Sequence, residues 1–73
     1  MKIGENIRSI RTTKNITQEQ LAETTGIKQS IISRYENGTI IPPIPKLEII
    51  SQALEVPINK LIEPEETNQQ EVI

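Results

Sequence analysis

The chain contains no cysteine, no histidine and no aspartate, and Tyr35 is its only aromatic residue. Without cysteine it has no disulfide framework, and without cysteine or histidine it lacks the usual ligands of a zinc site. Histidine-based acid–base catalysis is excluded for the same reason. We therefore expect no metal, no cofactor and no enzymatic activity.

Long apolar runs are absent as well. None approaches the roughly 20 residues of a membrane span, and the first residues, MKIGENIRSIR, lack the apolar segment of a signal peptide. These features predict a cytoplasmic protein with no membrane segment. The 73 residues correspond to one small domain whose core must be aliphatic.

The formal net charge is −2, but the two signs are unevenly distributed. Residues 1–46 hold seven basic and four acidic residues (+3), whereas residues 47–73 hold one basic and six acidic residues (−5). Because charge farther away than about 8 Å is screened at physiological salt, a nucleic acid responds to the surface that it touches. The net acidity therefore does not exclude a nucleic-acid partner.

The segment Thr17–Gly38 is typical of two short helices joined by a glycine turn. Thr17 is a good N-cap, and Gln20 completes a capping box. Gly26 supplies the positive φ that a sharp turn requires, and Gly38 ends the second helix. The inner face of that helix is predicted to consist of Ile27, Ile32 and Tyr35. This pattern predicts a helix-turn-helix over residues 17–37, the motif that places its second helix in the major groove of DNA.

Apolar residues at helical spacing continue on both sides of this segment. They form two stripes, Ile3, Ile7 and Ile10 before it and Leu47, Ile50 and Leu54 after it. Prolines keep the chain out of helix until about residue 44, and Val56-Pro57 ends that helix before a last short one. We therefore predict an all-α, compact five-helix bundle over residues 1–62. Residues 63–73 are acidic and amide-rich, and we expect them to form a mobile tail.

The run IGENIRSIRTTKNITQEQLAETTGIKQSIISRYENG, together with LEIISQALEVPINKLI, resembles the Cro/C1-type helix-turn-helix family, also called XRE-like. The resemblance covers residues 3–62 and implies the lambda-repressor-like fold. It also implies sequence-specific binding to a double-stranded DNA operator, usually by a homodimer that regulates transcription. We expect a repressor on an inverted repeat, dimerised through its C-terminal helices, with Ile49, Ile58 and Ile62 as candidates for the contact.

Candidate base contacts lie along the second helix of the motif. Its first turn projects side chains toward base edges. The amide of Gln29 can pair with adenine, and the guanidinium of Arg34 can pair with guanine or hold a phosphate. The expected base contacts are Lys28, Gln29, Ser30, Ser33 and Arg34.

Lys28 stands where the family usually has a capping serine or threonine. Lysine is a poor N-cap and its charge opposes the helix dipole, at a cost of about 1 kcal/mol. Residues that break a local rule cluster at functional sites. We therefore prefer a base or phosphate contact to the alternative of an exposed lysine without a partner.

Phosphate contacts are expected at Gln18, Asn37 and Thr39. Gln18 begins the first helix of the motif, where N–H groups suit a phosphate; its alternative is a helix former with no partner. Asn37 and Gly38-Thr39 match a loop that, in the family, touches phosphate on the other side of the groove. The same residues also have the composition of an ordinary turn.

Arg11 and Glu36 match, in the resembling family, an ion pair between the first helix and the end of the recognition helix. We assign both to architecture, because a semi-buried carboxylate needs a partner. Ile31 lies outside the apolar stripe and either rests half-buried on a neighbouring helix or touches a thymine methyl.

Ile40 and Ile41 are unusually apolar for an exposed loop. Together with the net acidity, they support a second hypothesis. This is a protein-interaction module, such as an antitoxin-like or anti-regulator domain, that has kept the fold but not the DNA contact.

Overall fold

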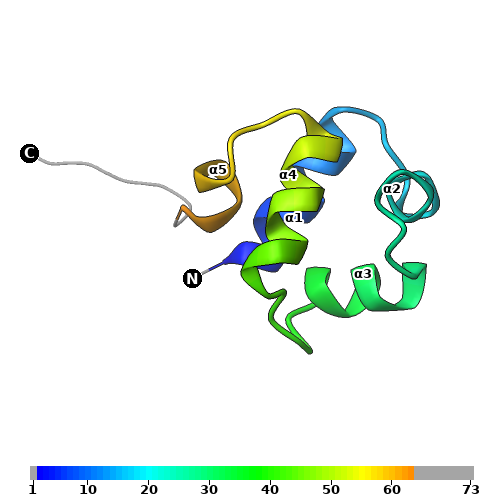
Figure 1. Cartoon of the computed structure of the whole chain (residues 1–73), viewed down its shortest axis with the longest axis horizontal. Coiled ribbons are helices and arrows are strands. Elements are labelled where there is room, and N and C mark those ends of the chain that lie inside the picture. The colour runs from blue at the N-terminus through cyan, green and yellow to red at the C-terminus, as the bar shows by residue number, and fades with distance from the viewer. Residues whose placement is uncertain (1, 64–73) are drawn as a thin grey trace, which may run out of the picture.

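The computed structural model describes residues 2–63, which form five α-helices and no strand (Figure 1). The helices are α1 (Ile3–Thr13), α2 (Gln18–Thr25), α3 (Gln29–Glu36), α4 (Ile44–Leu54) and α5 (Asn59–Ile62). The predicted all-α, five-helix fold is therefore confirmed. The predicted tail lies outside the described residues from position 64 onward.

The helices surround one core. α1 packs against α3 and α5, and α2 packs against α3 and α4. In Figure 1, α2 and α3 form the right-hand side of the molecule, and α5 lies on the opposite side. The fully buried side chains are Ile7, Leu21, Ile32, Leu47, Ile50, Leu54 and Leu61. Burying each of these side chains stabilises the fold by about 1.5–3 kcal/mol. Because every helix supplies at least one of them, all five helices contribute to the core.

The turn between α2 and α3 has the local structure that the sequence predicts. Thr17 Oγ1 accepts from the Gln20 N–H (3.0 Å), and Gln20 Oε1 accepts from the Thr17 N–H (2.9 Å), which completes the capping box. Gly26 (φ 75°) is the left-handed C-cap of α2. Ile27 is buried, but its predicted place within the second helix was wrong. The extended backbone of Lys28 (ψ 140°) delays the start of α3, so Ile27 lies in the turn.

The prolines before α4 also act as predicted. Pro43, with extended backbone (ψ 160°), is the N-cap of α4, and no side chain caps this end. Pro45 lies in the first turn, where its missing N–H has no intrahelical partner to lose.

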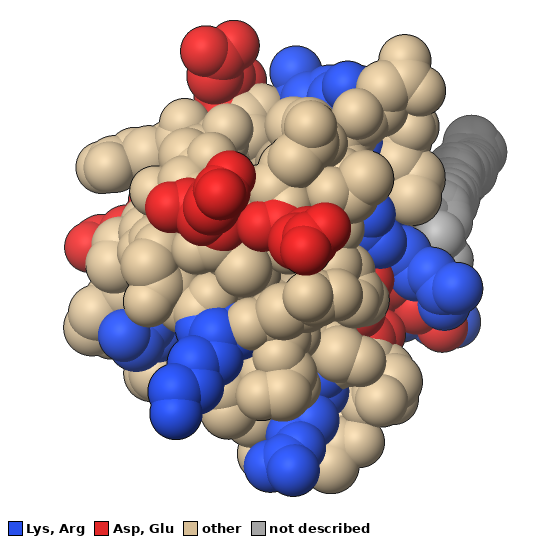
Figure 2. Space-filling view, turned by 90° about the vertical axis from the view of Figure 1, so that its right-hand side faces the viewer, with Lys and Arg blue, Asp and Glu red and all other residues tan. Residues whose placement is uncertain are grey.

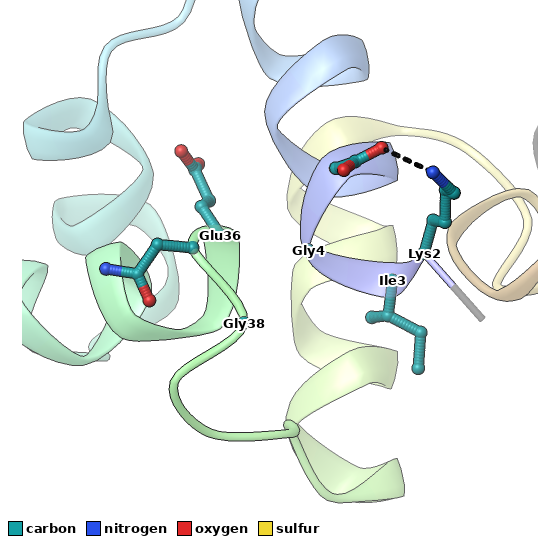
Figure 3. A pocket seen from close by; sticks show the side chains of 7 residues that line it. Lys2, Ile3, Gly4, Glu36 and Gly38 are labelled. Carbon is teal, nitrogen blue, oxygen red and sulfur yellow. Dashed lines mark ion pairs between the residues drawn. The ribbon is translucent and has the colours of Figure 1, made fainter.

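The start of α1 touches the end of α3 at a glycine, a contact that the sequence analysis missed. A Cβ on Gly4 would lie 2.2 Å from the carbonyl oxygen of Tyr35 and 2.7 Å from that of Glu36. Figure 3 shows Gly4 facing the turn that carries Glu36 and Gly38. Only glycine therefore allows the first turn of α1 to approach the main chain at the end of α3 this closely.

A buried amide ties α1 to α5. Asn6 is 8% exposed, and its Nδ2 donates to the carbonyl oxygens of Leu61 (2.9 Å) and Glu63 (2.6 Å). Both protons of the amide nitrogen are thereby satisfied, as a buried polar group requires. The last turn of the described chain is fixed to α1 through this side chain.

Candidate nucleic-acid interface

The outer side of α3 carries a row of polar and basic side chains. Lys28, Gln29 and Ser30 are exposed at its N-terminal end, Arg34 is exposed in its last turn, and Ser33 is partly buried. The inner side of α3 supplies Ile32 and Tyr35 to the core. Because the outer side of α3 is not used for packing in the core, a ligand can contact it.

Ile31 lies between these two sides of α3. It is partly buried and packs against the core cluster. The half-buried packing expected for Ile31 is observed, and a contact with a thymine methyl stays a prediction.

The N-terminal end of α3 is open. Lys28 is its N-cap and makes no side-chain capping hydrogen bond. The first N–H groups of a helix have no intrahelical partner, so they remain available to an acceptor from a ligand. The ammonium group of Lys28 adds positive charge at the same end, which favours an anionic or electron-rich partner.

Charge on this side of the molecule is divided between two levels. In Figure 2, basic side chains lie along the lower part of the face, at the level of α3, and carboxylates lie above them, at the level of α2. The carboxylates of α2 are Glu19 and Glu23, and the basic residues of α3 are Lys28 and Arg34. None of the four is in an ion pair within residues 2–63. On this face, the basic side chains at the level of α3 are therefore separated from the carboxylates of α2.

Arg11 and Glu36 form a buried ion pair behind this surface. Arg11 Nε donates to Glu36 Oε2 (2.6 Å) and Nη2 donates to Oε1 (3.0 Å), with side chains only 10% and 3% exposed. Arg11 Nη1 also donates to the carbonyl oxygen of Ile16 (2.7 Å). This two-pronged arrangement is the strong form of an arginine–carboxylate contact.

Gln18 joins the same carboxylate. Its Nε2 donates to Glu36 Oε1 (3.0 Å), so one carboxylate connects α1, α2 and α3. The sequence predicted for Gln18 either a phosphate contact or a helix former with no partner, so this bond to Glu36 was not foreseen. The second proton on Nε2 and the open N–H groups of the first turn of α2 still leave donors at this end.

The turn after α3 holds the remaining predicted residues. Asn37 is the C-cap of α3, and its Oδ1 accepts from both the N–H (2.9 Å) and the hydroxyl of Thr39. The Thr39 N–H also donates to the carbonyl oxygen of Arg34 (2.9 Å). With these bonds in place, Asn37 Nδ2 is the side-chain donor of this turn that has no partner within residues 2–63.

An apolar groove of about 230 Å³ adjoins this turn. It is lined by Ile3, Gly4, Tyr35, Gly38, Ile40, Ile41 and Pro42. Ile41 is 79% exposed, so the unusually apolar loop of the sequence lies at the surface.

Within residues 2–63, none of the helices has the length and apolar character needed to span a membrane. In the same range, no cluster of three or more histidine, cysteine, aspartate or glutamate side chains is placed to hold a metal ion.

Comparison with known proteins identifies the family and matches the fold. A family model described as Helix-turn-helix matches residues 7–61. The chain is 39% identical over 66 residues to the HTH-type transcriptional activator BcrR of Enterococcus faecalis, covering 90% of this chain and 32% of BcrR. It is 43% identical over 54 residues to the Antitoxin PezA of Streptococcus pneumoniae serotype 4, covering 74% of this chain and 34% of PezA. The chain thus spans about a third of the length of these two relatives.

A solved structure resembles this chain over nearly the whole length of the solved structure. The crystal structure of SinR, described as the master regulator for biofilm formation, in complex with DNA matches with a TM-score of 0.79 and 32% sequence identity. The match covers 84% of this chain and 98% of the SinR chain.

Proposed function

Because this chain belongs to the Cro/C1-type helix-turn-helix family of DNA-binding transcription regulators, we propose that it binds a specific operator as a homodimer and represses transcription there. The family assignment also makes the chain a regulator domain and not an enzyme. The observation that carries the proposal is the exposed side of α3, where polar and basic side chains surround an open helix N-terminus.

In the proposed complex, α3 lies in the major groove and the side chains on its outer side contact base edges. The amide of Gln29 pairs with N6 and N7 of adenine, and the guanidinium of Arg34 pairs with guanine or holds a phosphate. Ser30 and Ser33 accept or donate and discriminate less. Lys28 projects past the end of the helix and adds a base or phosphate contact.

Phosphate contacts on either side of α3 fix its register. On one side, the open N–H groups of α2 and the free proton of Gln18 Nε2 face the backbone. The carboxylate of Glu36 does not repel the phosphate strongly, because Arg11 neutralises it at 2.6 Å. On the other side, Asn37 Nδ2 donates to a phosphate oxygen, and the Thr39 hydroxyl donates there when its proton turns away from Asn37 Oδ1.

The proposed dimer uses the C-terminal helices. On the outer side of α4, Ile49 is 38% exposed, and Ile58 and Ile62 near it in sequence are only partly buried. A two-fold interface brings the same patch together from both copies, which an apolar patch satisfies without charge pairing. Two α3 helices then enter successive major grooves about 34 Å apart on an inverted repeat. A dimer seated on a promoter represses transcription by occupying it.

Selection of bound sequences from a random DNA pool tests the proposal, followed by titration of the selected site at several salt concentrations. We expect an inverted repeat, and log K falling by about 0.9 per phosphate neutralised for each tenfold rise in salt. Lys28→Ala should weaken binding. Binding that is indifferent to both sequence and salt would refute the proposal.

A second candidate function is a protein-interaction module of the antitoxin or anti-regulator kind. The relative named as an antitoxin and the exposed Ile41 favour it. This function predicts that Ile41→Ser weakens partner binding, while Lys28→Ala and Gln29→Ala leave it unchanged. The DNA function predicts instead that Lys28→Ala and Gln29→Ala weaken binding to DNA, while Ile41→Ser leaves it unchanged.

A further inference from the structure

Asn37 is followed by Gly38 in the exposed turn after α3. We propose that Asn37 is a site of spontaneous deamidation and that the Thr39 side chain controls its rate. The reaction follows from the chemistry of this turn and needs neither a partner nor an enzyme.

The reaction is an attack within the main chain. The Gly38 amide nitrogen bonds to Asn37 Cγ, the Cγ–Nδ2 bond breaks, and ammonia leaves with the proton that the Gly38 nitrogen gives up. Water then opens the resulting cyclic imide at either carbonyl carbon, giving aspartate or isoaspartate. Either product replaces a neutral amide by a carboxylate.

Gly38 makes Asn37 more open to attack than Asn15 or Asn6. Gly38 has no side chain, and a Cβ built on it meets nothing within 4 Å, so the space beside its Cα is open. Asn15 is also exposed, but the branched side chain of Ile16 crowds the nitrogen that follows it. Asn6 is buried with both amide protons bonded. Asn15 is therefore an internal control in the same chain.

The folded turn holds the reacting atoms apart. With ψ of 3° at Asn37, the Gly38 nitrogen is rotated away from Cγ, so the turn must open before the two atoms meet. Several hydrogen bonds oppose the opening. Two go from Thr39 to Asn37 Oδ1, and the Gly38 N–H donates to the carbonyl oxygen of Tyr35 (3.3 Å). The N–H groups of Thr39 and Ile40 also donate to the carbonyl oxygen of Arg34 (2.9 and 3.3 Å). The Thr39 hydroxyl is the one of these donors that a substitution can remove without altering the main chain.

Peptide mapping by mass spectrometry tests the proposal on the full chain, incubated at mildly alkaline pH. We expect Asn37 to lose its amide well before Asn15. Thr39→Val, which keeps the shape and removes the hydroxyl, should accelerate the loss about two- to tenfold, the factor that corresponds to one hydrogen bond. Thr39→Ser keeps the hydroxyl and should keep the rate of the original chain. Equal loss at Asn37 and Asn15, or a Thr39→Val rate equal to that of Thr39→Ser, would overturn it.

The consequence for DNA rests on the proposed function and is measured separately. If this turn faces a phosphate, Asn37→Asp adds a like charge there and should lower affinity for every sequence about fivefold, the factor for one such contact at about 4 Å in water. Unchanged affinity would contradict the placement of the turn against DNA. The mass measurement would still decide the deamidation itself, so the two failures are distinguishable.

Discussion

Glu36→Gln removes the negative charge on which Arg11 depends, and we expect it to destabilise the domain severely. The two side chains are only 10% and 3% exposed, so water cannot replace the lost partner. Breaking a buried ion pair in this way costs about 3–5 kcal/mol. A domain of this size has a free energy of unfolding on the order of 5 kcal/mol. The variant should therefore be largely unfolded or close to it.

Urea denaturation followed by circular dichroism measures this loss, provided that the slope m stays constant. The matched control is Glu5→Gln, which removes the same charge from the exposed Lys2–Glu5 pair (3.6 Å, side chains 54% and 60% exposed). We expect the control to cost under about 1 kcal/mol.

A double variant separates the charge from the packing. If the unpaired Arg11 cation causes the damage, Arg11→Met combined with Glu36→Leu should be more stable than Glu36→Gln alone, because no charge is left buried. The reasoning fails if Glu36→Gln costs no more than Glu5→Gln. It also fails if the double variant is no better than the single one.

Three further predictions concern α3 and its neighbours. Gln29→Ala should lose about 1–3 kcal/mol of discrimination at one base pair, measured by competition between operators that differ at that position; uniform weakening would contradict base reading. Lys28→Thr should stabilise the fold by about 1 kcal/mol in urea denaturation, because it restores an N-cap, while it weakens binding to DNA. Gly4→Ala should lower the free energy of unfolding by about 1–3 kcal/mol, because the new Cβ overpacks against main chain. Gly38→Ala should cost less, about 1–2 kcal/mol, because only the left-handed φ of 83° is strained there. The opposite order would show that α1 can move away from α3.

Much of the fold was predictable because its signals are local. The capping box of Thr17 and Gln20, the left-handed turn at Gly26 and the prolines before α4 each act within a few residues of themselves. The apolar stripes then determine which side of each helix faces the core. The exposed row on α3 followed from the same periodicity, and the pairing of Arg11 with Glu36 followed from family resemblance.

The contacts of Gly4, Asn6 and Gln18 were not predictable in this way, because their partners are distant in sequence. Glycine has a low helix propensity, so Gly4 is unexpected within a helix. Its presence is explained by the main chain at the end of α3, which leaves no space for a Cβ. Asn6 bonds to Leu61, 55 residues away. One signal was present: Asn6 falls within the stripe of Ile3, Ile7 and Ile10, where a polar residue is unexpected.

The network around Glu36 has a consequence for how DNA would bind. The carboxylate holds Gln18 at the start of α2 and lies in the last turn of α3, so it fixes two of the proposed DNA-contacting segments relative to each other. Phosphate binding at Gln18 does not require this bond to break, because Nε2 carries a second proton and Arg11 keeps the carboxylate neutralised. Since nothing in the network must be exchanged for a DNA contact, α2 and α3 should dock as a rigid unit, with the same angle between them in the free and the bound protein.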